Sequence, residues 1–222
     1  MKQRIRKLIN EYRTNGELKS RVRLYSGALL NAVFAVFKIF TGIIYRSSWL
    51  LAAGIYFLIF LVVRMRVINL DMKVLKAGAD PDYESEWSFY GKIGWLMFLL
   101  YIGLSGIVVQ VVKMNQANTY PGIVIYLIAL YAFYRYITAV IRIIKGRDDE
   151  RPYLSAARSI DMSFAVTEIF TLQTAMLAQF GQGRVYRTAN IITGTAVALI
   201  VAAVAVDMIL RSRKRLQNII SD

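Results

Sequence analysis

Apolar residues along this chain gather in six long blocks separated by short polar segments. The blocks cover roughly residues 25–45, 47–65, 90–112, 121–143, 160–180 and 188–210. A helix of about 20 apolar residues rises about 30 Å, which is the thickness of the hydrocarbon core of a bilayer. The pattern therefore predicts an all-α, polytopic membrane protein built as a bundle of six transmembrane helices.

The overall composition agrees with a membrane protein and excludes several kinds of chemistry. Of the 222 residues, 57% are hydrophobic and 19% are charged, whereas soluble domains carry about 45–50% and about 25%. The chain has no cysteine and no histidine, which rules out disulfides, thiolate nucleophiles, imidazole bases and Cys/His zinc sites. No phosphate-binding loop, dinucleotide-binding turn or nucleophile motif is present either. We therefore expect no catalytic residue, no cofactor, no metal site and hence no enzyme.

Basic residues are distributed unevenly between alternate connections, and the net charge of the chain is +14. One set of polar segments is rich in lysine and arginine: the leader up to Arg23, residues 64–92, residues 142–158 and the tail from Arg211. The opposite set carries Arg46, Lys113, Arg184 and Arg187. Because positively charged segments stay in the cytoplasm, both termini are predicted to be cytoplasmic. The charge thus reports membrane topology, and we expect no nucleic-acid partner.

This topology divides the chain into three regions: a basic cytoplasmic N-terminal segment (1–24), a six-helix transmembrane domain (25–210) and a basic cytoplasmic tail (211–222). No cleavable signal peptide is evident. The lipid bilayer is the expected partner, and the plasma membrane is the expected location. Arg46 should turn the first span tightly into the second. The longest connection is predicted at 66–89, where the acidic stretch Asp80–Glu86 is either a solvated loop or a weak collecting site for cations.

Five ionisable side chains inside predicted spans need to be weighed, because charges there are expensive and often functional. Two of them also have simpler interpretations: Lys38 could extend outward to the membrane surface, and Asp161 could be solvated at the start of its helix. Glu168 and Arg135 each lie about 12 Å from the cytoplasmic ends of consecutive spans. We hypothesise that these two form an ion pair, with Lys38 nearby. Such a pair would either fix the register of the helices or belong to a transport pathway.

A polar stripe follows the fifth span. Asp161 and Glu168 are two helical turns apart, so they share a face, and Thr171 continues it. A stripe of this kind usually faces the bundle interior or a water-filled cavity. The candidates for a transport pathway are therefore Asp161, Glu168, Thr171, Arg135 and Lys38. Asp207 lies near the cytoplasmic end of the last span, and we expect it to form a surface pair with Arg211.

The layout resembles the membrane domain of the cation diffusion facilitator (cation efflux) family, which also has six spans and cytoplasmic ends. The similarity is carried by the segments Asn31–Gly42, Tyr45–Ala53, Tyr134–Tyr136 and Leu154–Asp161, and by the run that begins at Gly194. It extends roughly over residues 20–215. The resemblance implies a six-helix cation transporter that favours a homodimer. Gly194, Ala198 and Ala202 have the i+4 spacing that lets helices approach closely, so they are a packing surface that such a dimer could use.

The metal site of that family does not carry over to this chain. The family places two acidic ligands on its second helix and two more ligands on its fifth, each pair four residues apart. These positions correspond here to Tyr56 and Phe60, and to Asp161 and Ala165, so that one ligand of four remains. The cytoplasmic metal-binding domain that usually follows the sixth helix is also missing from this sequence. The resemblance therefore implies the fold but argues against the usual exchange of zinc for protons.

Two functions remain open at this level. The chain is either a divergent transporter with a relocated site around Asp161 and Glu168, or a membrane subunit or scaffold that retains the fold without transporting. The substrate, a cation or a small organic ion, is unknown. A water-accessible path to Glu168 would favour the first function. A dry bundle with Arg135 bonded to Glu168 would favour the second.

Overall fold

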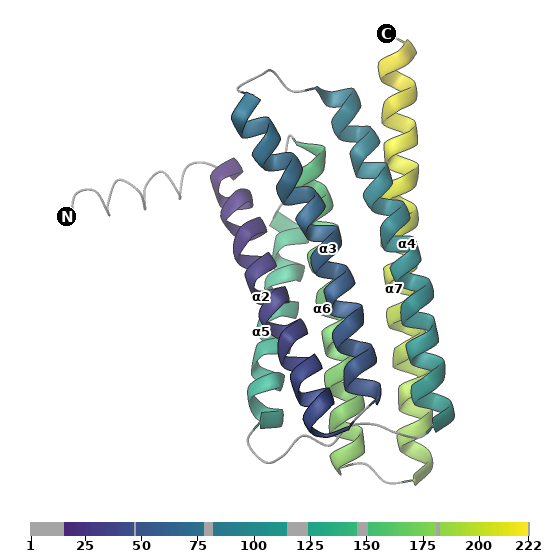
Figure 1. Ribbon diagram of the computed structural model, residues 1–222. Coiled ribbons are helices and arrows are strands. Elements are labelled where there is room, and N and C mark those ends of the chain that lie inside the picture. Colours follow the sequence, from purple (N-terminus) through teal and green to yellow (C-terminus); the bar gives the residue numbers. More distant parts are fainter. Residues whose placement is uncertain are drawn as a thin grey trace, which may run out of the picture.

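The computed structural model describes residues 16–46, 48–77, 82–114, 124–145, 151–180 and 183–221. These residues form six helices: α2 (Gly16–Ile44), α3 (Ser48–Ala77), α4 (Tyr83–Met114), α5 (Val124–Lys145), α6 (Pro152–Phe180) and α7 (Gly183–Ser221). Successive helices run in opposite directions, so that the start of α2 and the end of α7 lie at the same end of the bundle (Figure 1). The predicted all-α bundle is confirmed. Residues 1–15 of the predicted N-terminal segment lie outside the described residues.

The helices extend well beyond the predicted spans, and this corrects the predicted connection at 66–89. α3 continues to Ala77, and α4 already begins at Tyr83, where the Asp82 carboxylate accepts a hydrogen bond from the Ser85 amide at 3.1 Å. Glu86 is buried and forms an ion pair of 2.9 Å with Arg151, so it belongs to neither a solvated loop nor a free acidic cluster. Helices can continue beyond the apolar stretch that crosses a membrane, so boundaries predicted from hydropathy alone made these two helices too short. Asp80 and Pro81 lie outside the described residues.

α2 and α3 form a closely packed hairpin. Arg46 has a positive φ of 47° between the two helices, and it makes the tight turn expected at this position. The Cα of Gly54 faces the backbone of Ile39, and an added Cβ would come within 3.0 Å of the Ile39 amide nitrogen. Glycine is therefore needed at position 54, because any side chain would push the two helices apart.

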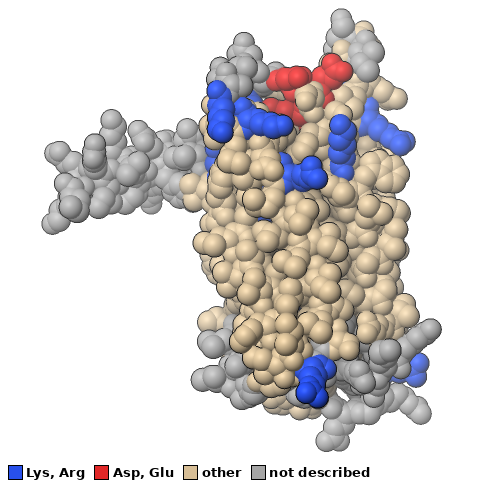
Figure 2. All heavy atoms as spheres, viewed as in Figure 1, with Lys and Arg blue, Asp and Glu red and all other residues tan. Residues whose placement is uncertain are grey.

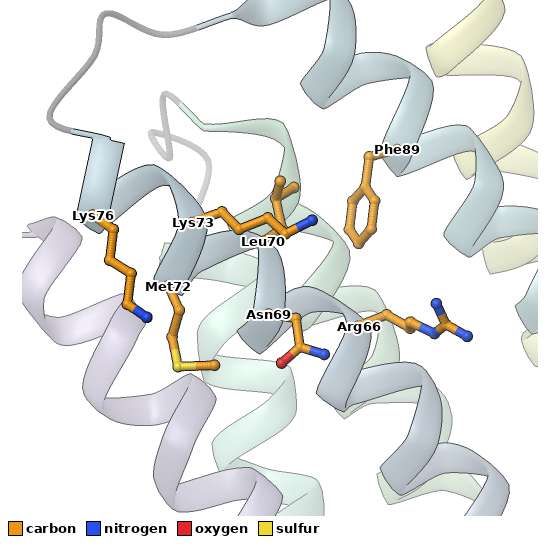
Figure 3. Close-up of a pocket in the computed structure, with 7 residues that line it drawn as sticks. All are labelled: Arg66, Asn69, Leu70, Met72, Lys73, Lys76 and Phe89. Carbon is orange, nitrogen blue, oxygen red and sulfur yellow. The ribbon is translucent and has the colours of Figure 1, made fainter.

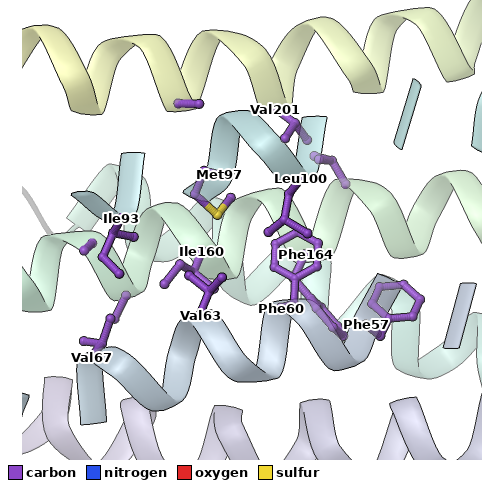
Figure 4. Close-up of a cluster of buried hydrophobic side chains, with 14 of the residues drawn as sticks. Phe57, Phe60, Val63, Val67, Ile93, Met97, Leu100, Ile160, Phe164 and Val201 are labelled. Carbon is purple, nitrogen blue, oxygen red and sulfur yellow. The ribbon is translucent and has the colours of Figure 1, made fainter. Parts of the chain in front are cut away.

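α6 is the central helix of the bundle, and it contacts every other described helix. Most of its side chains are buried. Figure 4 shows part of the apolar core, where Phe57 and Phe60 from α3 meet Phe164 from α6 and Leu100 from α4. The ring centroids of Phe57 and Phe164 are 4.8 Å apart. Because α6 is enclosed by its neighbours, it can carry polar side chains that a lipid-facing helix would not tolerate.

α4 and α7 pack along each other through small residues. A Cβ added to Gly194 would come within 2.7 Å of Val108 on α4, and Ala198 on the same face of α7 is also buried. Gly94 of α4 in turn faces Ala205 and Met208 of α7. The predicted packing surface on the last helix is therefore used inside the chain, at the contact between α4 and α7.

The outside of the bundle is divided into an apolar band and charged ends. Large apolar side chains are exposed around the middle, for example Leu130 (72%), Leu29 (67%) and Leu199 (61%). Lys, Arg, Asp and Glu gather at the end where α3 meets α4, and an uncharged band fills the middle of this face (Figure 2). α2, α3, α4 and α7 each contain a stretch that is long and apolar enough to cross a membrane, and α5 has a shorter one, Ile128–Ile141. This surface suits a hydrocarbon environment.

Candidate functional site

Ionisable side chains line the interior between α2, α3, α5 and α6 in three groups along α6. The Asp71 cluster consists of Arg21, Tyr25, Asp71 and Tyr153. The Asp161 cluster consists of Asn31, Arg64, Arg135 and Asp161. The Glu168 cluster consists of Lys38, Glu168 and Thr171. From Tyr153 to Glu168 the three groups extend over about 22 Å of α6, which is most of the thickness of a bilayer core.

In the Asp161 cluster, two arginines hold one buried carboxylate. Asp161 is 4% exposed, and both of its oxygens face the guanidinium of Arg64, which donates a hydrogen bond to Oδ1 and lies 3.5 Å from Oδ2. Arg135 reaches Asp161 Oδ1 at 3.4 Å and also donates to Asn31 Oδ1 at 3.1 Å. Side chains of three helices therefore meet at one carboxylate, and Asn31 links α2 to them through Arg135. The bidentate contact with Arg64 fixes the geometry as well as the charge.

The position of Arg64 is prepared by the backbone of α2. Its Nε donates a hydrogen bond of 2.9 Å to the carbonyl oxygen of Leu24. Gly27, three residues later on α2, leaves the space that the guanidinium fills, because an added Cβ would overlap Arg64. Arg64 is fully buried, and the glycine and the carbonyl thus form a fitted cradle for its charged group.

The Glu168 cluster is built more loosely. Lys38 Nζ lies 3.5 Å from Glu168 Oε1, donates a hydrogen bond of 3.2 Å to Thr171 Oγ1, and sits 4.5 Å from the centre of the Phe57 ring. Lys38 is 2% exposed and Glu168 is 0% exposed. Within the described part of the chain, neither carboxylate oxygen of Glu168 accepts a hydrogen bond. A buried carboxylate normally accepts several hydrogen bonds, so Glu168 is an exception that calls for an explanation.

Further unsatisfied polar atoms lie on the helices that enclose these two clusters. Ser163 Oγ on α6, Asn31 Nδ2 on α2 and Tyr131 Oη on α5 are buried without a hydrogen-bond partner among the described residues. Arg135 Nε is also buried and has no hydrogen-bond partner among these residues. These atoms offer both donors and acceptors, which suits water or a small hydrophilic solute better than an apolar filling.

The Asp71 cluster is the third group, and it lies at the end of the bundle where α2 begins and α7 ends. Asp71 Oδ1 accepts hydrogen bonds from Arg21 Nε at 2.8 Å and from Tyr153 Oη at 2.9 Å, and Oδ2 accepts one from Tyr25 at 3.0 Å. Burial lowers the pKa of Arg21, but its interactions with Tyr153 and Asp71 outweigh that effect and raise the pKa above its ordinary value. Arg21 therefore stays charged, and Asp71 is fully satisfied.

The structure revises several predictions about the interior charges. Glu168 pairs with Lys38, and Arg135 pairs with Asp161, so the hypothesised ion pair between Arg135 and Glu168 is not formed. The outward extension of Lys38 is wrong, because its ammonium points into the bundle. The solvated position of Asp161 is wrong as well. All three residues of the predicted stripe, Thr171 included, are buried on the inner side of α6.

Two buried charges were missed by the sequence analysis. Arg64 was counted among the basic residues of a cytoplasmic connection, and Asp71 was assigned to a loop. Both lie on the buried face of α3, and each is separated by three or four residues from the buried Val67 or Ile68. This helical spacing was the available signal. The predicted surface pair of Asp207 and Arg211 is confirmed, at 2.8 Å and with both side chains exposed.

The positions that correspond to the second-helix metal ligands of cation efflux transporters are filled by aromatic packing. The rings of Tyr56 and Phe60 meet edge to face at 5.2 Å between centroids, and Phe60 meets Phe164 at 5.6 Å. Ala165 is also buried and offers no ligand. In the described residues, no group of three or more His, Cys, Asp or Glu side chains could hold a metal ion. The side chains that contact Asp161 are those of two arginines, whose positive charge repels a metal cation.

The fold and surface define the class of this protein. Antiparallel helices with an apolar exterior, charged ends and buried ion pairs are the features of a multi-pass integral membrane protein. No family model, no curated protein and no solved structure matches the chain, so the resemblance to cation efflux transporters rests on the segments quoted above.

Proposed function

We propose that this protein transports a small cation, with the Glu168 cluster as its transport site and Lys38 as the competing internal cation. One observation carries the proposal: Glu168 is completely buried, yet neither carboxylate oxygen accepts a hydrogen bond among the described residues. A transport site must attract its ion and also release it. A carboxylate held only by an ammonium 3.5 Å away meets both needs better than one saturated by arginines.

The ligand set indicates the kind of cation. Glu168 offers two carboxylate oxygens and Thr171 offers a hydroxyl, which are hard oxygen donors. The cluster contains a single acidic group, which balances one positive charge. A proton or a monovalent metal ion therefore suits it better than zinc or calcium, whose sites normally gather several ligands.

Lys38 gives the proposed site a means of coupling. When a cation binds Glu168, the ammonium of Lys38 loses its counter-charge inside a low-dielectric bundle. Lysine can respond by releasing its proton, which arginine cannot do. Cation binding would then drive proton release, and the two ions would move in opposite directions. The proposed location is the plasma membrane, with the basic end of the bundle in the cytoplasm. All three residues of the cluster come from one chain, so a homodimer is not required for the site.

A second candidate function is a membrane scaffold that does not transport. The Asp161 cluster favours it, because a fully buried network that ties four helices together is also what a rigid structural bundle needs. In that case Lys38 and Glu168 would serve only to hold α2 against α6.

Flux through proteoliposomes distinguishes the two functions. Purified full-length protein would be reconstituted, and uptake of sodium, potassium and divalent metals and movement of protons would be recorded across an imposed pH gradient. The test variant is Glu168→Gln, and the matched control is Asp207→Asn, which removes an exposed carboxylate from α7. Transport predicts flux in the wild type and the control, and its loss in Glu168→Gln. If the folded wild-type protein moves none of these ions, the proposed transport is contradicted and the scaffold function is favoured.

A third variant tests the coupling. Lys38→Gln keeps a polar side chain beside Glu168 but removes the titrating ammonium. If Lys38 couples the two ions, cation flux in Lys38→Gln persists and no longer depends on the pH gradient. Flux that keeps its full pH dependence in this variant would show that Lys38 is not the coupling group.

A further inference from the structure

A basic groove opens on the surface between α3 and α4, away from the interior clusters. It has a volume of about 400 Å³ and is lined by Arg66, Asn69, Leu70, Met72, Lys73, Lys76 and Phe89. Figure 3 shows Arg66 and Lys73 extending from α3 toward α4, while Lys76 lies beside Met72 and the Phe89 ring forms the wall on the α4 side.

The three cations of the groove have no counter-charge within it. None of the lining residues is acidic, and in the part of the chain that the structure describes Arg66, Lys73 and Lys76 form no ion pair. The nearest carboxylate along α3, Asp71, is buried on the opposite face and is engaged by Arg21. Three exposed cations that line one recess without an acidic partner make this recess positive, which attracts an anion.

The groove lies where the surface of α3 changes character. The exposed residues before it are apolar: Ile59, Val62 and Met65 are between 42% and 58% exposed. From Arg66 onward, the exposed positions of α3 are predominantly polar or basic. This change marks the boundary between the hydrocarbon core and the headgroup region. The same recess combines basic groups with the apolar side chains of Leu70 and Phe89, so it suits a ligand that has both an anionic and an apolar part.

We infer that this groove binds the phosphate headgroup of an anionic phospholipid from the leaflet at the basic end of the bundle. Arg66, Lys73 and Lys76 would hold the phosphate, Asn69 would donate a hydrogen bond, and Leu70 and Phe89 would contact the glycerol and the first acyl carbons. Basic recesses between transmembrane helices are well suited to anionic lipid headgroups. The inference does not depend on whether the bundle transports an ion.

Native mass spectrometry of the full-length protein in an uncharged detergent tests the inference. Phosphatidylglycerol and phosphatidylcholine would be titrated separately, and the dissociation constant of the first bound lipid would be measured. The test variant is Arg66→Gln/Lys73→Gln/Lys76→Gln. The matched control is Lys92→Gln/Arg213→Gln/Lys214→Gln, which removes the same number of exposed positive charges from α4 and α7. Melting curves would verify that both variants fold, and Lys73→Gln alone would replace the triple variant if that one does not.

The expected result is a preference for phosphatidylglycerol that the groove variant loses by about tenfold or more, while the control changes by about twofold or less. Lys73→Gln alone should lose a smaller part of the preference. Equal losses in the two triple variants would overturn the inference, because they would indicate a general effect of net charge. Displacement of the lipid by millimolar inorganic phosphate would overturn the lipid assignment and indicate a site for free phosphate. Equal binding of phosphatidylglycerol and phosphatidylcholine would overturn the assignment of the groove to an anionic ligand, whether lipid or free phosphate.

Discussion

Asp161 and Glu168 are two buried carboxylates on one face of α6, and they differ in the side chains that contact them. Asp161 is held by two arginines, and one of them, Arg64, is fitted against a glycine of α2. Glu168 faces one lysine at 3.5 Å and, among the described residues, accepts no hydrogen bond. The two carboxylates are therefore similarly buried, but they differ in the number and kind of hydrogen-bond donors around them.

The difference shows how one polar stripe can divide structural and functional work. The guanidinium groups of Arg64 and Arg135 present several donors in a fixed geometry, so the Asp161 cluster holds the helices in place. The Glu168 cluster instead contains a lysine, which unlike arginine can release its proton when it is buried. We accordingly assign the Asp161 cluster to stability, and the proposed transport function would use the Glu168 cluster for exchange. Four substitutions would break or sharpen this comparison.

The largest effect is expected from Asp161→Asn. The change removes the carboxylate that Arg64 and Arg135 share, and removing one partner of a buried ion pair destabilises proteins by about 3–5 kcal/mol. The free energy of unfolding would be measured in detergent by denaturant titration. A loss below about 1 kcal/mol, which is typical of surface pairs, would show that the Asp161 cluster is not structural.

A smaller effect is expected from Glu168→Gln, even though Glu168 is at least as buried as Asp161. Lys38 then lacks its counter-charge but can become neutral, so we expect a loss of about 1–3 kcal/mol, in the range of one unsatisfied buried polar group. The double variant Lys38→Met/Glu168→Gln should recover part of that loss. The same unfolding titration measures all three proteins. A loss equal to that of Asp161→Asn would remove the distinction between the two clusters.

Gly27→Ala tests the cradle of Arg64 without changing any charge. The added methyl group overlaps the guanidinium, so either Arg64 or α2 must move, and overpacking of this kind costs about 1–3 kcal/mol. Thermal melting in detergent would show the loss. Gly106→Ala is the matched control, because an added Cβ there meets no atom within 4 Å. Equal melting temperatures for Gly27→Ala and the wild type would mean that the space beside Arg64 is not filled as described.

The smallest effect is expected from Asp207→Asn. This carboxylate pairs with Arg211 at 2.8 Å, but both side chains are more than half exposed, and surface pairs contribute about 0–1 kcal/mol. Melting in low and high salt would measure it, and the small difference should shrink as salt screens the pair. A large loss would imply that α7 depends on this pair in a way that its exposure does not suggest.

The interior pattern of α6 could be predicted from the sequence, whereas its partners could not. The spacing of Asp161, Glu168 and Thr171 follows from helical geometry, so their common buried face is a local property. Which cation meets which carboxylate depends on the rotation and depth of α2, α3 and α5, and on side chains several ångströms long. The expected pair of Arg135 and Glu168 was wrong for this reason.

Hydropathy also left Arg64 and Asp71 outside the predicted interior. Charged residues lower the hydropathy of a window wherever they occur, so a span predicted from hydropathy stops at the first cluster of charges. The structure continues α3 to Ala77, because the buried face of that helix stays complementary to its neighbours beyond the apolar stretch. A charged side chain can be buried where other side chains compensate its charge, and a hydropathy value takes no account of those side chains.

By itself, the sequence determined that the chain is an all-helical membrane protein with an asymmetric charge, no cysteine or histidine chemistry and one polar stripe. These properties depend on the composition and on the helical spacing of residues, and both follow from the order of residues in the chain. Only the tertiary structure decided that Arg64 and Arg135 hold Asp161, that Lys38 faces Glu168, and that Phe89 of α4 closes the groove lined by the basic residues of α3. Each of these contacts joins atoms whose distance is set by how helices pack against one another, and that packing is a property of the whole bundle.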